Sequence, residues 1–193
     1  ARPSRACTLK CSTVAILSRL PPACHVENER KGLMLTDIRR SLLTRAFDLL
    51  YGPLVLLHEP LGVLFHGPAW HGRRLALLTE LPAAAVVIEV GAGEGRLLRE
   101  LGFRAIHSTG YEPSPAMRRR AWIRSIGLIA GRAENLPLPD AAVDLILITY
   151  PGPCIFEPET WSEFARVLRD GGQVRILAGG RLGVGGDAGL RGG

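Results

Sequence analysis

A glycine-rich stretch preceded by an acid is the first place where this chain could do chemistry. Residues 89–95 read Glu-Val-Gly-Ala-Gly-Glu-Gly, so the glycines alternate with other residues. Such glycines let the backbone turn sharply and approach a ligand closely, because no Cβ stands in the way. A pyrophosphate-binding loop reads Gly-x-Gly-x-x-Gly, and its third glycine would fall on Arg96. The loop therefore argues against a dinucleotide, and Glu89 suits an ammonium or sulfonium group better than a phosphate.

A second acid, Glu112, lies 23 residues after Glu89, at the end of the next predicted strand. A carboxylate in this position can accept hydrogen bonds from both hydroxyls of a ribose. NAD enzymes use the same device, so Glu112 predicts a nucleoside ligand without distinguishing between cofactors. The alternative is that Glu112 is a surface residue at a strand end.

Short apolar runs alternate with helical patterns from position 86 onward, and they place both acids at strand ends. The predicted strands are 86–90, 105–111, 128–130, 143–149 and 173–177, and the predicted helices are 95–101, 115–125 and 157–168. Apolar strands separated by helices are typical of a parallel sheet covered on both faces. The sequence therefore predicts an α/β fold, a Rossmann-like parallel sheet of about five strands with flanking helices. In such a sheet, ligands bind beyond the carboxyl ends of the strands.

Residues 86–177 resemble the class I S-adenosylmethionine-dependent methyltransferases of type 11, in the branch similar to the ubiquinone and menaquinone biosynthesis C-methyltransferases. Four stretches carry the resemblance. They are the loop 89–95, the acidic-x-Ser-x-x-Met stretch 112–117, Gly-Arg-Ala-Glu-Asn-Leu-Pro at 131–137, and Ala-Arg-Val-Leu-Arg-Asp-Gly-Gly at 165–172. In the family an aspartate follows the glycine of the third stretch, whereas this chain has Arg132 there.

The resemblance implies S-adenosylmethionine as the cofactor and assigns residues to bind it. They are Glu89, Gly91, Ala92, Gly93, Gly95, Glu112, Pro113, Met117, Ala133, Glu134 and Thr149. Glu112 would hold the ribose, and Ala133 and Glu134 would lie beside the adenine. No catalytic residue is identified, because methyl transfer from a sulfonium mainly requires that the two reactants be positioned and shielded from water. The residues that could line the acceptor pocket are Tyr51, His58, His66, Trp70, His71 and Tyr150.

The chain divides into four predicted parts. Residues 1–35 lack periodicity and are expected to be a poorly structured extension, and residues 36–82 are expected to form an N-terminal helical cap with helices at 37–50 and 70–81. Residues 83–177 are the predicted cofactor-binding domain. Residues 178–193, of which eight are glycine, are expected to be a flexible tail. Relatives continue with a helix and two more strands, so we expect those strands to be missing and one sheet edge to be exposed.

These features predict a cytoplasmic S-adenosylmethionine-dependent methyltransferase that transfers a methyl group in line to a small-molecule acceptor. The alternative from another class is a truncated or inactive protein that still binds the cofactor. A third hypothesis is nucleic-acid binding through Arg118, Arg119, Arg120 and Arg124, a cluster that a solvated helix face also explains. Nothing in the sequence indicates the oligomeric state.

Other kinds of site find less support in the sequence. Cys7, Cys11, Cys24 and His25 could be drawn as a zinc site, but their spacing fits no standard zinc finger and no metal is expected. The cysteines do not suggest a disulfide framework, which favours a reducing cytoplasm. No stretch reaches the ~18–20 apolar residues of a membrane-spanning helix.

Overall fold

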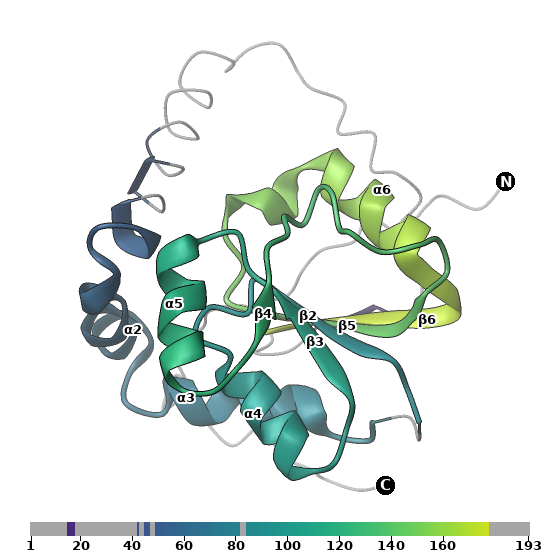
Figure 1. The fold of residues 1–193 in the computed structure, drawn as a ribbon, viewed down its shortest axis with the longest axis horizontal. Coiled ribbons are helices and arrows are strands. Elements are labelled where there is room, and N and C mark those ends of the chain that lie inside the picture. The colour runs from purple at the N-terminus through teal and green to yellow at the C-terminus, as the bar shows by residue number, and fades with distance from the viewer. Residues whose placement is uncertain (1–14, 18–41, 43–44, 47–48, 82–83, 178–193) are drawn as a thin grey trace, which may run out of the picture.

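The structure, a computed structural model, describes residues 15–17, 42, 45–46, 49–81 and 84–177. Its centre is a six-stranded sheet with the strand order β1-β6-β5-β2-β3-β4 (Figure 1). The strands are β1 (Ala15–Leu17), β2 (Val87–Val90), β3 (Ser108–Tyr111), β4 (Leu128–Ile129), β5 (Val143–Thr149) and β6 (Leu168–Leu177). All pairs among β2 to β6 are parallel, and only β1 pairs antiparallel.

The five parallel strands confirm the predicted Rossmann-like α/β fold. Counted along the chain from β2, they lie in the order third, second, first, fourth, fifth. The order reverses between β2 and β5, and in doubly wound sheets this switch point opens the crevice where ligands bind. Each residue of β2 is buried, because the strand lies in the middle of a sheet that is covered on both faces.

Helices from different parts of the chain cover the two faces of the sheet (Figure 1). The helices of the domain are α4 (Arg96–Phe103), α5 (Pro115–Ile123) and α6 (Pro158–Val167), with the 3-10 helix η3 (Pro153–Phe156) before α6. One apolar core joins the sheet to Phe164 and Val167 of α6. A second core joins the opposite face to Leu97 and Leu101 of α4 and also to Leu77.

The segment before β2 is made of short helices. They are η1 (Val55–Leu57), α2 (His58–His66), α3 (Trp70–Arg73) and η2 (Arg74–Leu78). The single helix predicted for residues 70–81 is wrong, since the α-helical part ends at Arg73 and a 3-10 helix follows. In this η2 helix, Leu77 and Leu78 are buried against the sheet, so tertiary packing selects the tighter geometry. The described residues of the helix predicted over 37–50 are helical.

Strand β1 corrects two expectations from the sequence. Residues 1–35 were expected to be a poorly structured extension and one sheet edge to be exposed, but Ala15–Leu17 pairs antiparallel with Val174–Ile176 of β6. An edge strand presents a row of unpaired backbone donors and acceptors, and a short apolar segment satisfies them. Three residues are too few to show a period-two pattern, so the sequence carried no signal for this strand.

Several expectations fall on residues that the structure does not describe. They concern Cys7, Cys11, Cys24, His25 and the glycine-rich residues 178–193. The predicted division into four parts likewise stays a prediction. Among the described residues, no helix is both long and apolar enough to cross a membrane, and no group of three or more potential metal-ligating side chains comes together.

Candidate functional site

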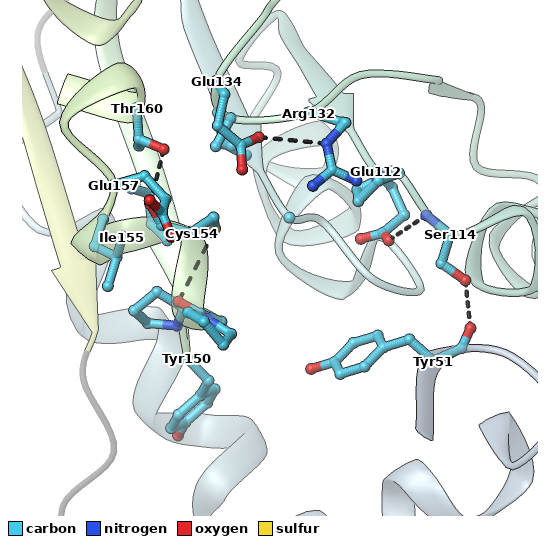
Figure 2. Close-up of a pocket in the computed structure, with 18 of the residues that line it drawn as sticks. Tyr51, Glu112, Ser114, Arg132, Glu134, Tyr150, Cys154, Ile155, Glu157 and Thr160 are labelled. Atoms are coloured by element: carbon cyan, nitrogen blue, oxygen red, sulfur yellow. Dashed lines mark hydrogen bonds and ion pairs between the residues drawn. The ribbon is translucent and has the colours of Figure 1, made fainter. Parts of the chain in front are cut away.

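A cavity of about 500 Å³ opens at the carboxyl ends of the parallel strands (Figure 2). Segments that follow four different strands line it, together with Tyr51 from the N-terminal part. The lining residues include Gly91, Glu112, Pro113, Ser114, Arg132, Ala133, Glu134, Thr149, Tyr150, Cys154, Ile155, Glu157, Thr160 and Phe164. Figure 2 shows Glu112 and Ser114 on one side and Cys154, Glu157 and Thr160 on the other. The cavity therefore lies at the topological switch point, where the fold predicts a ligand.

The glycine loop that follows β2 is held by hydrogen bonds within the chain. The backbone N–H groups of Gly91 and Ala92 both donate to the carbonyl of Tyr111, at 2.8 and 3.1 Å. The N–H of Gly93 donates to Oε2 of Glu112 at 2.8 Å. A loop that cradles phosphates needs such N–H groups to point at the ligand instead. The geometry thus supports the argument from the glycine spacing against a pyrophosphate.

Gly95 is the position in this loop where glycine is indispensable. Its φ of +72° lies in the left-handed region, where it starts helix α4. A Cβ at this position would lie 2.6 Å from Cγ2 of Ile126, well inside van der Waals contact. Both the backbone conformation and the close approach therefore require glycine.

Glu112 is the most fully engaged acid in the large cavity. Its residue is 3% exposed, and the N–H of Ser114 donates to Oε1 at 2.8 Å while Gly93 donates to Oε2. Burial raises the pKa of this carboxyl, and the two backbone hydrogen bonds and Arg118 oppose the shift. A carboxylate offers about four acceptor positions, so each oxygen can accept one more hydrogen bond. Two hydroxyls of a ribose would fit that demand.

Glu89 lies beneath the cavity and does not line it. The residue is 1% exposed, and Oε1 accepts a hydrogen bond from the hydroxyl of Thr149 at 3.3 Å. Oε2 has no hydrogen-bond partner in the described part of the chain. Burial raises its pKa to about 8, although the nearby Arg74 favours the charged form. A buried carboxyl with an unsatisfied oxygen is costly, and the raised pKa means that Glu89 keeps its proton at neutral pH.

The segment after β4 lines the cavity between Thr160 on one side and Glu112 on the other (Figure 2). Ala133 is buried, and Glu134 lines the cavity beside it. Nε of Arg132 lies 3.5 Å from Oε2 of Glu134, so the arginine that replaces the family's aspartate is paired with the neighbouring acid. Positive charge at this position is therefore partly neutralised within the chain.

A second, smaller cavity of about 50 Å³ lies between the glycine loop and the N-terminal helices. Rings surround it: Tyr51 packs on His58 at 5.1 Å, His58 on Trp70 at 5.6 Å, and Trp70 on Tyr150 at 5.4 Å between centroids. The hydroxyl of Tyr150 donates to the carbonyl of Trp70 at 2.9 Å. Arg74 and Arg96 bring positive charge to its lining, and Glu59 and Glu94 bring negative charge.

The two tyrosines between these cavities are poor bases. Burial, with a smaller contribution from Glu112, raises the pKa of Tyr51 to about 12. Burial also raises the pKa of Tyr150. Tyr150 has a φ of +50°, an uncommon conformation for a residue with a side chain. Strain of this kind is often found at functional sites, and here it turns the chain at the carboxyl end of β5.

The structure brings most of the predicted site residues together. Those that line the large cavity are Gly91, Glu112, Pro113, Ala133, Glu134 and Thr149. Those that line the small cavity are Gly91, Ala92, Gly93 and Thr149. Glu89, Gly95 and Met117 line neither cavity, and Met117 is completely buried, where it packs helix α5 rather than reaching the site.

Other lining residues carried no motif in the sequence. Cys154, Ile155, Thr160 and Phe164 come from η3 and α6. Only their position after β5 could have indicated them, since the loop after β5 must cross the cavity before α6 returns along the sheet. His66 and His71 belong to helices, but their side chains lie outside the described part of the structure.

Comparisons with known proteins match the part of the chain that contains this cavity. The family model described as "Methyltransferase domain" matches residues 88–176. An uncharacterized methyltransferase of Mycobacterium tuberculosis is 36% identical over 101 residues, which are 50% of this chain and 41% of that protein. One of Geobacillus kaustophilus is 30% identical over 98 residues, covering 48% of this chain and 46% of that protein. The chain thus spans less than half the length of these curated relatives.

Solved structures of related proteins were also found. An S-adenosylmethionine-dependent methyltransferase of Thermotoga maritima, described as a possible histamine N-methyltransferase, is 30% identical with a TM-score of 0.46, covering 59% of this chain and 53% of that one. A Methanococcus maripaludis protein described as a putative S-adenosylmethionine-dependent methyltransferase is 22% identical with a TM-score of 0.49, covering 58% and 56%.

The parallel sheet and its switch point define a Rossmann-like domain, and in this class of fold ligands bind at the switch point. Within that class, the family match assigns it more narrowly. Residues 88–176 match the model of a methyltransferase domain, and the relative that is 36% identical over 101 residues is described as an uncharacterized methyltransferase.

Proposed function

We propose that this chain binds S-adenosylmethionine in the large cavity and transfers its methyl group to a small-molecule acceptor. The observation that carries the proposal is the buried carboxylate of Glu112, which is fixed by the N–H groups of Gly93 and Ser114 and borders the cavity. Two backbone donors already fix the orientation of this carboxylate, so little conformational entropy is lost when a ribose binds to it. The family match to residues 88–176 supports the same ligand.

The other residues around the two cavities fit the remaining parts of the cofactor. Ala133 and Glu134 would lie beside the adenine. The methionine part carries an ammonium and a carboxylate group, which need opposite charges nearby. Arg74 supplies a cation in the small cavity next to the glycine loop, and Glu59 and Glu94 are the acids that line this cavity. Glu89 is buried behind both cavities.

The residues of this chain would act mainly by position and by excluding water. When bound, the cofactor supplies an activated methyl group on sulfur, so the protein need not create the electrophile. Tyr51, Tyr150 and the stretch Pro151–Pro153 wall the cavity towards the N-terminal helices, and we propose that the acceptor enters there. Tyrosine hydroxyls are protonated at neutral pH and burial raises the pKa of both further, so neither would deprotonate the acceptor. The Tyr150 hydroxyl already donates to the carbonyl of Trp70.

Calorimetric titration with S-adenosylmethionine and S-adenosylhomocysteine tests the proposal. Glu112→Gln keeps the size of the side chain but presents only one good acceptor, and we expect it to weaken binding about tenfold or more, as the loss of a charged hydrogen bond does. Glu159→Gln removes the same charge from an exposed position on α6 and should bind like the wild type. Equal affinities for these two variants, or no binding by the wild type, would contradict the proposal.

A methyl-transfer assay then separates an enzyme from a protein that only binds the cofactor. The panel should include quinone precursors, since the sequence resembles that branch, and other small apolar acceptors. Transfer to any of them would support the catalytic proposal. Binding of the cofactor without transfer to any acceptor would favour the alternative of an inactive methyltransferase domain.

A further inference from the structure

Helix α5 carries an arginine cluster that the proposed function leaves unexplained. Arg118, Arg119 and Arg120 lie within the helix, and Arg124 follows its last residue. The sequence allowed either a nucleic-acid-binding face or a solvated face. The contacts of these side chains favour neither explanation. Three of the four arginines contact the segments that surround the candidate cofactor site.

Arg120 and Arg124 both form ion pairs with Glu94. Glu94 stands in the glycine loop between Gly93 and Gly95, and its side chain is only 2% exposed. Arg96 approaches the same carboxylate, with Nη2 3.5 Å from Oε2. A carboxylate this deeply buried is tolerated only when it is paired. Helix α5 therefore supplies the counter-charges that keep Glu94, and with it the loop, in place.

Arg118 makes a matching contact with the second cofactor segment. Its Nη1 donates to the backbone carbonyls of Glu112 and Pro113 at 2.6 and 2.8 Å. Arg118 also opposes the rise in the pKa of Glu112 that burial causes. The guanidinium thus fixes the backbone that presents this carboxylate to the cavity. One helix contacts the glycine loop on one side and the Glu112 segment on the other.

We propose that Arg118, Arg120 and Arg124 are positioning residues for the cofactor, acting through Glu94 and through the backbone of Glu112. Their role rests on the proposed function, because they would hold the two segments at the separation that the cofactor requires. Glycines give the loop backbone more freedom than other residues would. Without the ion pairs to Glu94, the loop would occupy its binding conformation for a smaller fraction of the time, and the apparent affinity would fall by that fraction.

Arg119 provides a control on the same helix. It is exposed, and it is the only arginine of the four for which none of the contacts above is found in the described part of the chain. A nucleic-acid-binding face would depend on Arg119 as much as on its neighbours, since exposed cations supply most phosphate contacts. A positioning role predicts that Arg119 is dispensable. The four arginines therefore distinguish the two explanations within one helix.

Two readouts test the proposal on the full chain. The first is amide hydrogen exchange of the loop at Gly91, Ala92, Gly93 and Gly95 without ligand, and the second is the Kd for S-adenosylhomocysteine. We expect Arg120→Gln and Arg124→Gln to speed exchange in the loop and to weaken binding about tenfold, as a loop formed one-tenth of the time would. Arg118→Gln should weaken binding similarly, with its exchange effect at Ser114 instead. Arg119→Gln should change neither.

A pair of variants that restores the balance of charge distinguishes a loss of positioning from a general loss of folding. Glu94→Gln removes the carboxylate that pairs with Arg120 and Arg124, whereas Arg96 keeps its ion pair with Glu59. The double variant Glu94→Gln/Arg120→Gln also removes one of the two arginines. We expect the double variant to be less impaired than the sum of the single variants predicts, because the two residues interact directly. Circular dichroism should show the native helix content for each variant.

The proposal is overturned if Arg120→Gln and Arg124→Gln match Arg119→Gln in both readouts, or if all the arginine variants weaken binding equally. If the wild type does not bind S-adenosylhomocysteine, the proposed function fails by itself. Hydrogen exchange still decides the positioning role in that case, since faster loop exchange in Arg120→Gln than in Arg119→Gln supports it and equal exchange refutes it.

Discussion

Glu89 shows how one side chain can link the fold to its ligand. The carboxyl lies in the middle of the sheet with a pKa of about 8, because burial penalises the charged form. In the unfolded chain the same group ionises near its ordinary pKa. The folded state therefore retains a proton that the unfolded state loses, over the range between these two values.

The first prediction concerns stability against pH. Below the pKa that Glu89 has in the unfolded chain, the folded and unfolded states both hold the proton. The cost of burying a charged carboxylate is therefore absent. As the pH rises towards 8 only the unfolded state ionises, and the free energy of unfolding falls by about 1.4 kcal/mol for each unit of pKa difference. Above 8 both states are ionised and the loss is complete.

Denaturant unfolding of Glu89→Gln between pH 5 and 9 measures this contribution. We expect the variant to lose less stability than the wild type across that range, by on the order of 3–5 kcal/mol. Glu159→Gln, which changes an exposed acid, should retain the wild-type slope. Parallel curves for the wild type and Glu89→Gln would show that Glu89 does not hold its proton in the folded state.

The loop and helix that follow β2 illustrate the element scale. Gly95 adopts a left-handed conformation against Ile126 at the start of α4, whereas Gly102 lies inside the same helix with no atom near the position of a Cβ. The two glycines differ in their backbone conformation and in the atoms that surround them. Their substitution by alanine should therefore have opposite effects.

Thermal unfolding of the two alanine variants tests this difference. Gly95→Ala should destabilise the protein by about 1–3 kcal/mol, the cost of a strained conformation, with the contact to Ile126 adding to it. Gly102→Ala should stabilise it by about 0.5–1 kcal/mol, because alanine loses less backbone entropy in a helix. A Gly95→Ala variant as stable as the wild type would mean that the loop is not held in this conformation.

At the scale of the whole molecule, Arg175 joins parts that are distant in the sequence. This residue of β6 is buried, and its guanidinium donates to the carbonyls of Leu77 and Glu80 at 3.0 and 3.2 Å. These carbonyls end the N-terminal helical segment that also lines the small cavity. One side chain thus connects that segment to strand β6 of the sheet.

Removing this guanidinium should loosen the N-terminal helices. Arg175→Met preserves the length of the side chain but leaves buried carbonyls without donors, and we expect a loss of about 2–4 kcal/mol in the free energy of unfolding. Arg99→Met, on the exposed side of α4, should change it by no more than about 0.5 kcal/mol. Equal stability of the two variants would show that the carbonyls find other donors.

The sequence by itself determined the parallel sheet and the two acids at its switch point. Strand β5 was predicted with the same bounds that the structure shows, because a buried strand must be continuously apolar. Glycine spacing and the interval from Glu89 to Glu112 are local features that report what a backbone loop can approach. Together with the family resemblance, these patterns predicted six of the residues that line the large cavity.

Only the tertiary structure decided how the remaining parts meet. It paired Ala15–Leu17 with the edge of β6, buried Met117 away from the cavity, and directed the arginines of α5 onto Glu94 and the Glu112 backbone. The physical reason is the same in each case. An edge strand, a packed side chain and an ion pair depend on partners that lie far away in the sequence, and no local period or spacing identifies such partners.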